Sequence, residues 1–202
     1  IVRGCAGKIG PVEGAFAVLQ VTRWPNSDAG AAGLVNEILG DPGDMRARID
    51  SILRARGINE VFPQEVVEQA ESFGARLEPE QWKGREALFD LPICTIDGAD
   101  AKDFDDAVSL EDLGGGMLRL GVHIADVAYY VKPGTALNAE AYTRATSVYL
   151  PDRVVPMLPP ALSDNLCSLV PRQERLTMSA FMDINSSGKV TKRRLAETVI
   201  RS

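Results

Sequence analysis

Cysteine, histidine and tryptophan are scarce in this chain of 202 residues, which contains three, one and two of them respectively. The cysteines Cys5, Cys94 and Cys167 are odd in number and far apart in the sequence. That spacing argues against a disulfide framework and against a C-x-x-C metal site. We therefore expect reduced, buried thiols.

Long apolar runs are also missing. No run approaches the ~18 residues that span a bilayer, and the N-terminus shows no charged start followed by an apolar core and a cleavage site. We therefore expect a cytoplasmic protein with no membrane partner. Because the chain begins at Ile1 and ends in the strand-like sequence ETVIRS, we also expect a fragment of a longer protein.

The third feature that the sequence lacks is an excess of positive charge. Its 22 Lys and Arg residues are outnumbered by 28 Asp and Glu residues, which gives a formal net charge of -6. This balance argues against non-specific nucleic-acid binding through a globally basic surface, but it is compatible with a local basic groove. With 45% hydrophobic and 25% charged residues, the composition indicates a globular protein of one or two packed domains.

Three regions follow one another along the chain, and together they predict an α+β fold. Residues 1–40 carry short apolar runs separated by glycine and proline, and they are predicted to be all-β. Residues 41–91 form a predicted helical connector, with helices expected at 44–56 and 63–74. Residues 92–202 mix short strands, loops and hairpins.

Two β-hairpins are predicted in the third region. In residues 117–124 of the first, large aliphatic side chains alternate with others such as Gly121 and His123, which indicates one buried face. His123 lies opposite the aliphatic face, and we favour a structural role for it over that of a general base. Before the second hairpin we expect a short helix at 136–146 and an irregular, proline-rich segment at 150–171.

The stretch TIDGADAKDFDDAV, residues 95–108, concentrates negative charge. Lys102 is the single positive residue among five aspartates, which are Asp97, Asp100, Asp103, Asp105 and Asp106. Neighbouring carboxylates repel one another unless they are solvated, protonated or neutralised by a cation. The stretch fails the calcium-loop template D-x-[DN]-x-[DN]-G, because counting from Asp103 puts Ala107 and Val108 at the fifth and sixth positions.

Composition alone leaves two interpretations of this loop open. An Asp-rich loop is more often a solvated turn than an active site. Here, however, the apolar residues Ile96, Phe104, Ala107 and Val108 should anchor the backbone and prevent the charges from spreading apart. Carboxylate and water oxygens are the ligands that hard cations prefer, so the loop favours a Mg²⁺ site.

Several phrases in the same order resemble one known family. TIDGADAKDFDDAV, then LGVHIADVAYYVKPG and ERLTM, are similar to the N-terminal part of the catalytic RNB domain of the ribonuclease II and ribonuclease R family, most of all to its ribonuclease R members. The resemblance runs from about residue 92 to the end of the chain. EGAFAVLQVTRWP and GLVNEILG resemble the end of the second cold-shock domain, which implies an OB-like barrel before the helical connector.

The resemblance implies Mg²⁺-dependent hydrolysis of single-stranded RNA from its 3′ end, with release of nucleoside 5′-monophosphates by a monomeric enzyme. The family's catalytic and metal-binding aspartates fall on Asp97, Asp103, Asp105 and Asp106. We expect Asp97 and Asp106 to bind the metal directly and Asp103 to support the same site. Asp105 is expected to have the most critical role, either at a second metal or in orienting the attacking water.

RNA contacts are expected at Tyr149 and Arg153. Tyr149 matches a family aromatic that stacks on the terminal base, although a tyrosine packed under the proline-rich loop is the alternative. Arg153 is a candidate phosphate contact, as are four further sites, namely Arg144, Arg172, Arg175 and the late basic run at 189–194. Two rival functions remain open: a non-catalytic RNA-binding module, and a metal-stabilised interaction domain without RNA.

Overall fold

The computed structural model describes residues 14–27, 29–98, 101 and 103–202. The chain divides into two compact units, each of which is described by itself. The first comprises the residues up to Val61 together with Tyr149–Val155, and the second comprises Phe62–Val148 and Pro156–Ser202. None of the helices in the described residues has the length and apolar character that crossing a bilayer requires.

The first unit contains a two-stranded antiparallel sheet and one helix. Strand β1 (Phe16–Arg23) pairs with β2 (Ala32–Gly40), which agrees with the β-rich prediction for this region. Among the described residues no other strand joins these two, so a closed barrel is not seen there. Helix α1 (Met45–Ala55) begins where the side chain of Asp44 accepts a hydrogen bond from the backbone N–H of Arg46.

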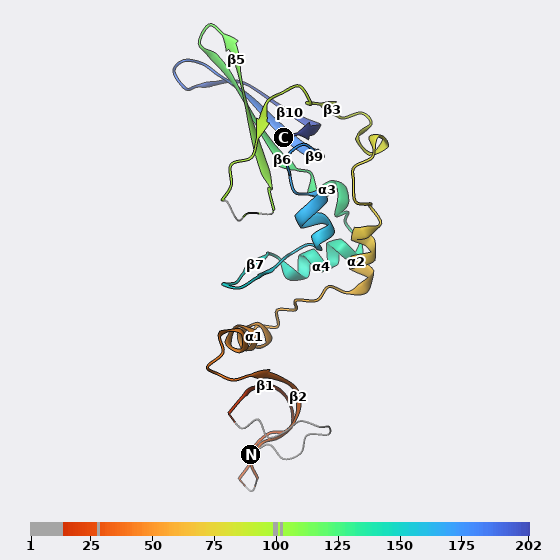
Figure 1. Ribbon diagram of the computed structural model, residues 1–202, viewed down its shortest axis with the longest axis vertical. Coiled ribbons are helices and arrows are strands. Elements are labelled where there is room, and N and C mark those ends of the chain that lie inside the picture. Colours follow the sequence, from red (N-terminus) through yellow and green to blue (C-terminus); the bar gives the residue numbers. More distant parts are fainter. Residues whose placement is uncertain (1–13, 28, 99–100, 102) are drawn as a thin grey trace. The chain divides into compact units, whose positions relative to one another are not determined.

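Two helices of the second unit match the predicted positions, 63–74 and 136–146, to within a few residues. Helix α2 (Gln64–Glu71) packs against α4 (Ala136–Arg144), and both lie beside the short helix α3 (Val127–Tyr130) in Figure 1. The segment predicted to be irregular contains a π-helix, η2 (Leu162–Leu166), and the connector contains a 3₁₀-helix, η1 (Pro79–Trp82). Leu137, Leu162, Leu166 and their neighbours form one apolar core.

A six-stranded sheet organises the second unit (Figure 1). Its order is β3-β10-β9-β6-β5-β4, and every pairing is antiparallel except that of β3 with β10. The strands are β3 (Glu86–Ala87), β4 (Ile93–Cys94), β5 (Asp106–Gly114), β6 (Met117–Ala125), β9 (Glu174–Ile184) and β10 (Val190–Arg201). Both predicted hairpins are therefore present, as β5–β6 and β9–β10. A separate two-stranded sheet consists of β7 (Val148–Tyr149) and β8 (Val154–Val155).

The buried face of β6 is the polar one. Gly121 and His123 are buried, whereas Leu118 and Ile124 on the opposite face are 41% and 46% exposed. Burial of the polar face is possible because the His123 ring lies 2.7 Å (Nδ1) from Ser179 Oγ and 3.0 Å (Nε2) from the hydroxyl of Ser109. The alternation of aliphatic residues in the sequence favours burial of the aliphatic face instead. That pattern takes no account of side-chain hydrogen bonds between strands.

Candidate active site

The aspartate loop, residues 95–105, connects β4 to β5, and Asp106 is the first residue of β5. In the β4–β5 register, Ile93 lies opposite Ser109 and Cys94 lies opposite Val108. This pairing holds the two ends of the loop next to each other, and the β5 end carries Asp103, Asp105 and Asp106. Asp100 and Lys102 lie outside the described residues.

The last part of the loop is fixed to the rest of the unit by backbone hydrogen bonds. The N–H of Phe104 donates to Ser168 Oγ at 3.0 Å, and its carbonyl oxygen accepts from the N–H of Leu169 at 2.8 Å. The carbonyl oxygen of Asp105 accepts from the N–H of Ala125 at 3.0 Å. Phe104 also packs against the apolar core, so the predicted anchoring is confirmed at this residue.

The anchoring differs among the other apolar residues of the stretch. Ala107 is 1% exposed and belongs to the core. Ile96, by contrast, is 83% exposed, so its predicted anchoring role is wrong. The loop is therefore fixed at its β5 end, where Asp103, Asp105 and Asp106 lie.

The carboxylates influence one another electrostatically. Asp97, Asp105 and Asp106 are exposed, and Asp103 is half-buried. The pKa of Asp105 is raised, first by partial burial of its carboxylate and then by repulsion from Asp103, Asp106 and Asp97. Four carboxylates thus share one electrostatic neighbourhood, and a cation placed there would relieve the repulsion.

These residues are of the right chemical type to bind a metal ion, but their side chains are not already arranged as a coordination site. Carboxylate oxygens are the ligands that Mg²⁺ prefers, so the donor set is suitable. Within the described part of the chain, however, no three His, Cys, Asp or Glu side chains lie close enough together to form a ready metal cage. The ligand assignments to Asp97, Asp103, Asp105 and Asp106 therefore stay predictions.

The two predicted RNA contacts lie in the first unit. Tyr149 in β7 is 68% exposed, so its ring can be reached from solvent. Arg153 forms ion pairs with three carboxylates: Glu60 at 2.6 Å, Asp152 at 2.6 Å, and Asp50. A phosphate would have to compete with these acids for the guanidinium. Both RNA-binding assignments stay predictions.

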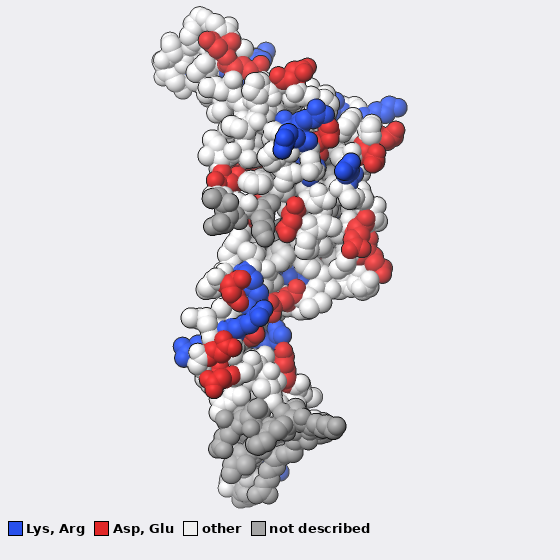
Figure 2. Space-filling model, viewed as in Figure 1, with Lys and Arg blue, Asp and Glu red and all other residues white. Residues whose placement is uncertain are grey.

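The other candidate phosphate contacts have different surroundings. Arg175 is only 2% exposed, so it cannot meet RNA at the surface. Arg144 pairs with Glu140 at 2.8 Å and lies over the ring of Phe62. Acidic and basic side chains are interspersed on the face drawn in Figure 2.

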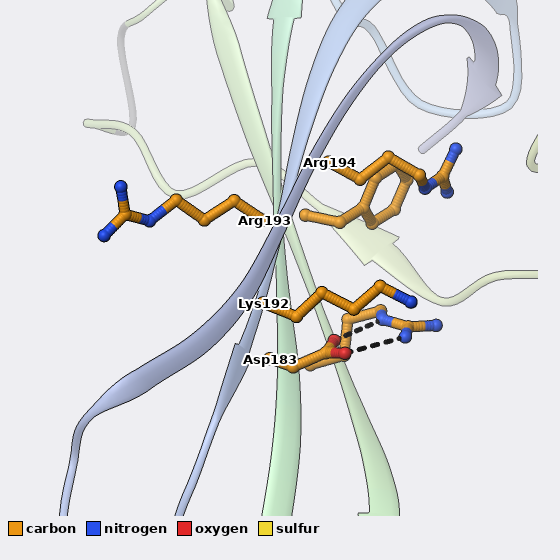
Figure 3. A pocket seen from close by; sticks show the side chains of 6 residues that line it. Asp183, Lys192, Arg193 and Arg194 are labelled. Atoms are coloured by element: carbon orange, nitrogen blue, oxygen red, sulfur yellow. Dashed lines mark hydrogen bonds and ion pairs between the residues drawn. The ribbon is translucent and has the colours of Figure 1, made fainter.

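The late basic run belongs to β10. Lys192 and Arg194 point to one side of the strand and Arg193 points to the other, as Figure 3 shows. Arg194 pairs with Glu86 at 2.5 Å and lies over the ring of Phe181. The charge of Arg194 is therefore already matched by an acid of the same unit, and in the same hollow Arg119 of β6 is paired with Asp183.

The sequence reasoning missed Ser168, which holds the loop between two of the predicted catalytic residues. Ser168 is fully buried, and 64 positions separate it from Phe104. The segment around it was predicted only as irregular and proline-rich. Nothing in the local sequence indicates that its hydroxyl accepts a hydrogen bond from a distant backbone.

Family models match both the N-terminal part and the C-terminal part of the chain. The family model for the RNB domain matches residues 85–202, and that for a cold shock domain matches residues 5–63. The ribonuclease R of Thermotoga maritima is 44% identical over 187 residues. That alignment covers 92% of this chain and 26% of the relative, so the chain spans about a quarter of the length of this relative.

Solved structures show the same fold. Mycoplasma genitalium RNase R in complex with ribose methylated single-stranded RNA is 28% identical, with a TM-score of 0.90, and the match covers 100% of this chain and 31% of that chain. Yeast Ssd1, a pseudonuclease, is also 28% identical, with a TM-score of 0.69 and coverage of 91% and 23%. The aspartate loop lies within the region that the RNB family model matches, and this chain belongs to the RNB domain family.

Proposed function

We propose that the protein containing this chain is an exoribonuclease that hydrolyses RNA from the 3′ end and releases nucleoside 5′-monophosphates with Mg²⁺. Membership of the RNB domain family and similarity to proteins named ribonuclease R support this proposal. The observation that carries it is the anchored β5 end of the aspartate loop, which holds Asp103, Asp105 and Asp106 next to one another, with Asp97 near enough to act electrostatically on Asp105. A fold that keeps four carboxylates together gains most when a divalent cation joins them.

Each aspartate has a distinct proposed role. Asp97 and Asp106 would ligate Mg²⁺, and Asp103 would support the same site. When bound, the ion would supply positive charge next to the scissile phosphate. Asp105, with its backbone fixed on both sides, would accept a hydrogen bond from the attacking water and orient it toward phosphorus.

Recognition of RNA without sequence preference is the second part of the proposal. The exposed ring of Tyr149 would stack on the 3′-terminal base, a contact worth ~1 to 3 kcal/mol that tolerates any base. Arg153 would contact a phosphate that displaces one of its three acid partners. The partner is a single-stranded 3′ end, and we expect a cytoplasmic monomer.

A non-catalytic RNA-binding module is the second candidate. The match to a pseudonuclease of the same fold shows that the architecture also occurs in a protein described as inactive. The lack of a ready metal cage among the described residues points in the same direction. All four motif aspartates are nevertheless present, and this favours the enzyme.

The test is product release by the complete protein that contains this chain. A fluorescent RNA with a 3′ tail should yield nucleoside 5′-monophosphates with Mg²⁺ and none when the metal is chelated. Asp105→Asn should lower turnover at least ~100-fold while RNA affinity is retained, because only the attack on phosphorus needs this carboxylate.

Asp90→Asn is the matched control, because Asp90 is an exposed aspartate of the same unit outside the loop. It should leave turnover unchanged. RNA binding by the wild type without any cleavage would support the non-catalytic candidate. Wild-type turnover in Asp105→Asn would overturn the role given to Asp105.

A further inference from the structure

Arg175 is a buried cation whose hydrogen-bond acceptors are neutral. Its guanidinium donates to the carbonyl oxygens of Ser168 at 2.8 Å, Asn165 at 3.0 Å and Glu174 at 2.8 Å. The side-chain oxygens of Asn165 and Gln173 accept at 3.0 and 2.9 Å. Burial lowers the pKa of Arg175, which shows that the site disfavours the charge that it holds.

The acceptors show what this side chain holds in place. A guanidinium presents its donors in a rigid, planar fork, so several bonds to one backbone segment fix the position of that segment. Here the segment is the C-terminal end of η2 and the two residues that follow it. Arg175 therefore fixes residues 165–168 against the start of β9.

The same segment fixes the aspartate loop. Ser168 Oγ accepts from the N–H of Phe104, and the N–H of Leu169 donates to the carbonyl oxygen of Phe104. Phe104 stands between Asp103 and Asp105 in the sequence. Two hydrogen bonds to one residue restrict both of its backbone dihedral angles, and those angles set the directions of the flanking carboxylates.

Asp105 and Arg175, which are connected through Ser168 and Phe104, both lie near the buried thiol of Cys167. The pKa of the Cys167 thiol is raised to about 12, mainly by burial. The charge of Asp105 raises it further, and the charge of Arg175 lowers it. Both charged groups therefore lie close to the same buried thiol, although they belong to different elements.

We propose that Arg175 and Ser168 are positioning residues that set the directions of the Asp103 and Asp105 carboxylates through Phe104. The inference rests on the proposed function, because it concerns the geometry in which these acids meet Mg²⁺ and RNA. Displacement of a reacting group by about 1 Å can lower turnover ~100-fold with little effect on substrate affinity. A contact that only stabilised the fold would lower thermal stability and leave this geometry unchanged.

The test uses Ser168→Ala in the complete protein. Loss of the hydroxyl leaves the N–H of Phe104 without its acceptor but removes no charge. We expect kcat to fall roughly tenfold to a hundredfold, KM for RNA to change less than threefold, and half-maximal activation to need more Mg²⁺. Ser163→Ala is the matched control, because Ser163 lies in η2 close to Ser168 in the sequence and its hydroxyl donates to its neighbour Asp164. It should leave all three quantities unchanged.

Two further measurements keep the proposal falsifiable. Arg175→Lys retains a charge but not the planar fork, and in folded protein it should reproduce the Ser168→Ala pattern. Calorimetric titration with Mg²⁺ at a temperature where both proteins are folded should show weaker binding to Ser168→Ala than to wild type. That readout does not depend on RNA cleavage, so it remains decisive if the proposed nuclease activity is absent.

Unchanged kcat and Mg²⁺ affinity in Ser168→Ala would overturn the inference. Equal losses in Ser168→Ala and Ser163→Ala would overturn it too, because they would show a general effect on the segment. Absence of monophosphate release by the wild type would instead count against the proposed function alone.

Discussion

His123 is a neutral, buried imidazole rather than a member of the catalytic group. It is fully buried, and both ring nitrogens are occupied by the hydroxyls of Ser109 and Ser179. Burial lowers its pKa to about 4 from an ordinary value of 6.5. The structural role favoured from the sequence fits this environment, since a ring so enclosed cannot exchange protons with a substrate.

The pH dependence of stability should report this residue. Because the folded-state pKa is depressed, His123 contributes stability that is fully present above pH 6.5 and is lost as the pH falls through 4. The shift corresponds to roughly 3 kcal/mol in the free energy of unfolding. Denaturant unfolding between pH 7 and 4 should show wild type losing about that much more than His123→Gln, because the carboxylate background is common to both.

NMR offers a check that does not depend on how the variant folds. His123 is the only histidine in this chain, so its imidazole signals can be assigned without ambiguity. They should titrate near pH 4. Titration near pH 6.5 would show that the ring is accessible and would contradict its buried, neutral state.

At the scale of elements, sequence patterns predicted where helices and strands lie better than which of their faces are buried. The helix predicted at 44–56 is present at 45–55, and the Asp44 side chain that caps it acts locally. The buried face of β6 was not predictable in this way, because it depends on Ser109 and Ser179 in other strands. The same reason hid Ser168: its role depends on a contact across 64 positions.

Gly121 is the position where the β5–β6 hairpin depends most on the absence of a side chain. A Cβ there would lie 2.3 Å from Ser109 Oγ and 2.9 Å from His123 Nε2. Gly121→Ala must therefore displace the Ser109–His123 contact, and we expect a loss of ~1 to 3 kcal/mol in stability. Thermal unfolding followed by circular dichroism should show a melting temperature several degrees lower.

Two companion variants make this test specific. Gly30→Ala is the matched control, because no atom lies within 4 Å of the added Cβ, and its melting temperature should equal that of wild type. Adding Ser109→Ala to Gly121→Ala removes the nearest clashing atom and should restore part of the loss. Equal melting temperatures for Gly121→Ala and wild type would show that the strands tolerate the side chain.

At the scale of the whole chain, the proposed RNA substrate is a polyanion, whereas the chain itself carries a net charge of -6. Many of its arginines are already paired with acids, as Arg153, Arg119 and Arg194 show. Diffuse attraction to RNA is therefore weak, and local features have to supply affinity. A divalent cation held by the aspartate loop would offset part of the local negative charge at the point where, in the proposed reaction, a phosphate approaches.

The local sequence determines the positions of helices and strands more fully than the arrangement of the site, and the reason is physical. Strand and helix positions follow from short-range periodicity, and the RNB and cold shock matches confirm the family that the sequence resembles. The roles of Asp97, Asp103, Asp105 and Asp106 depend on how their side chains arrange around an ion. That arrangement is not encoded in local periodicity, and a bound ion would itself determine it.

The most direct test of the central claim is anomalous diffraction from crystals of the protein soaked in Mn²⁺, a stand-in for Mg²⁺ with the same preference for oxygen ligands. The account predicts an anomalous peak at the aspartate loop, about 2.0 to 2.3 Å from carboxylate oxygens of Asp97 and Asp106. The peak should be lost or weakened in Asp106→Asn. Ordered carboxylates at the loop without a peak, in crystals that show Mn²⁺ bound elsewhere, would contradict the claim that these acids form a metal site.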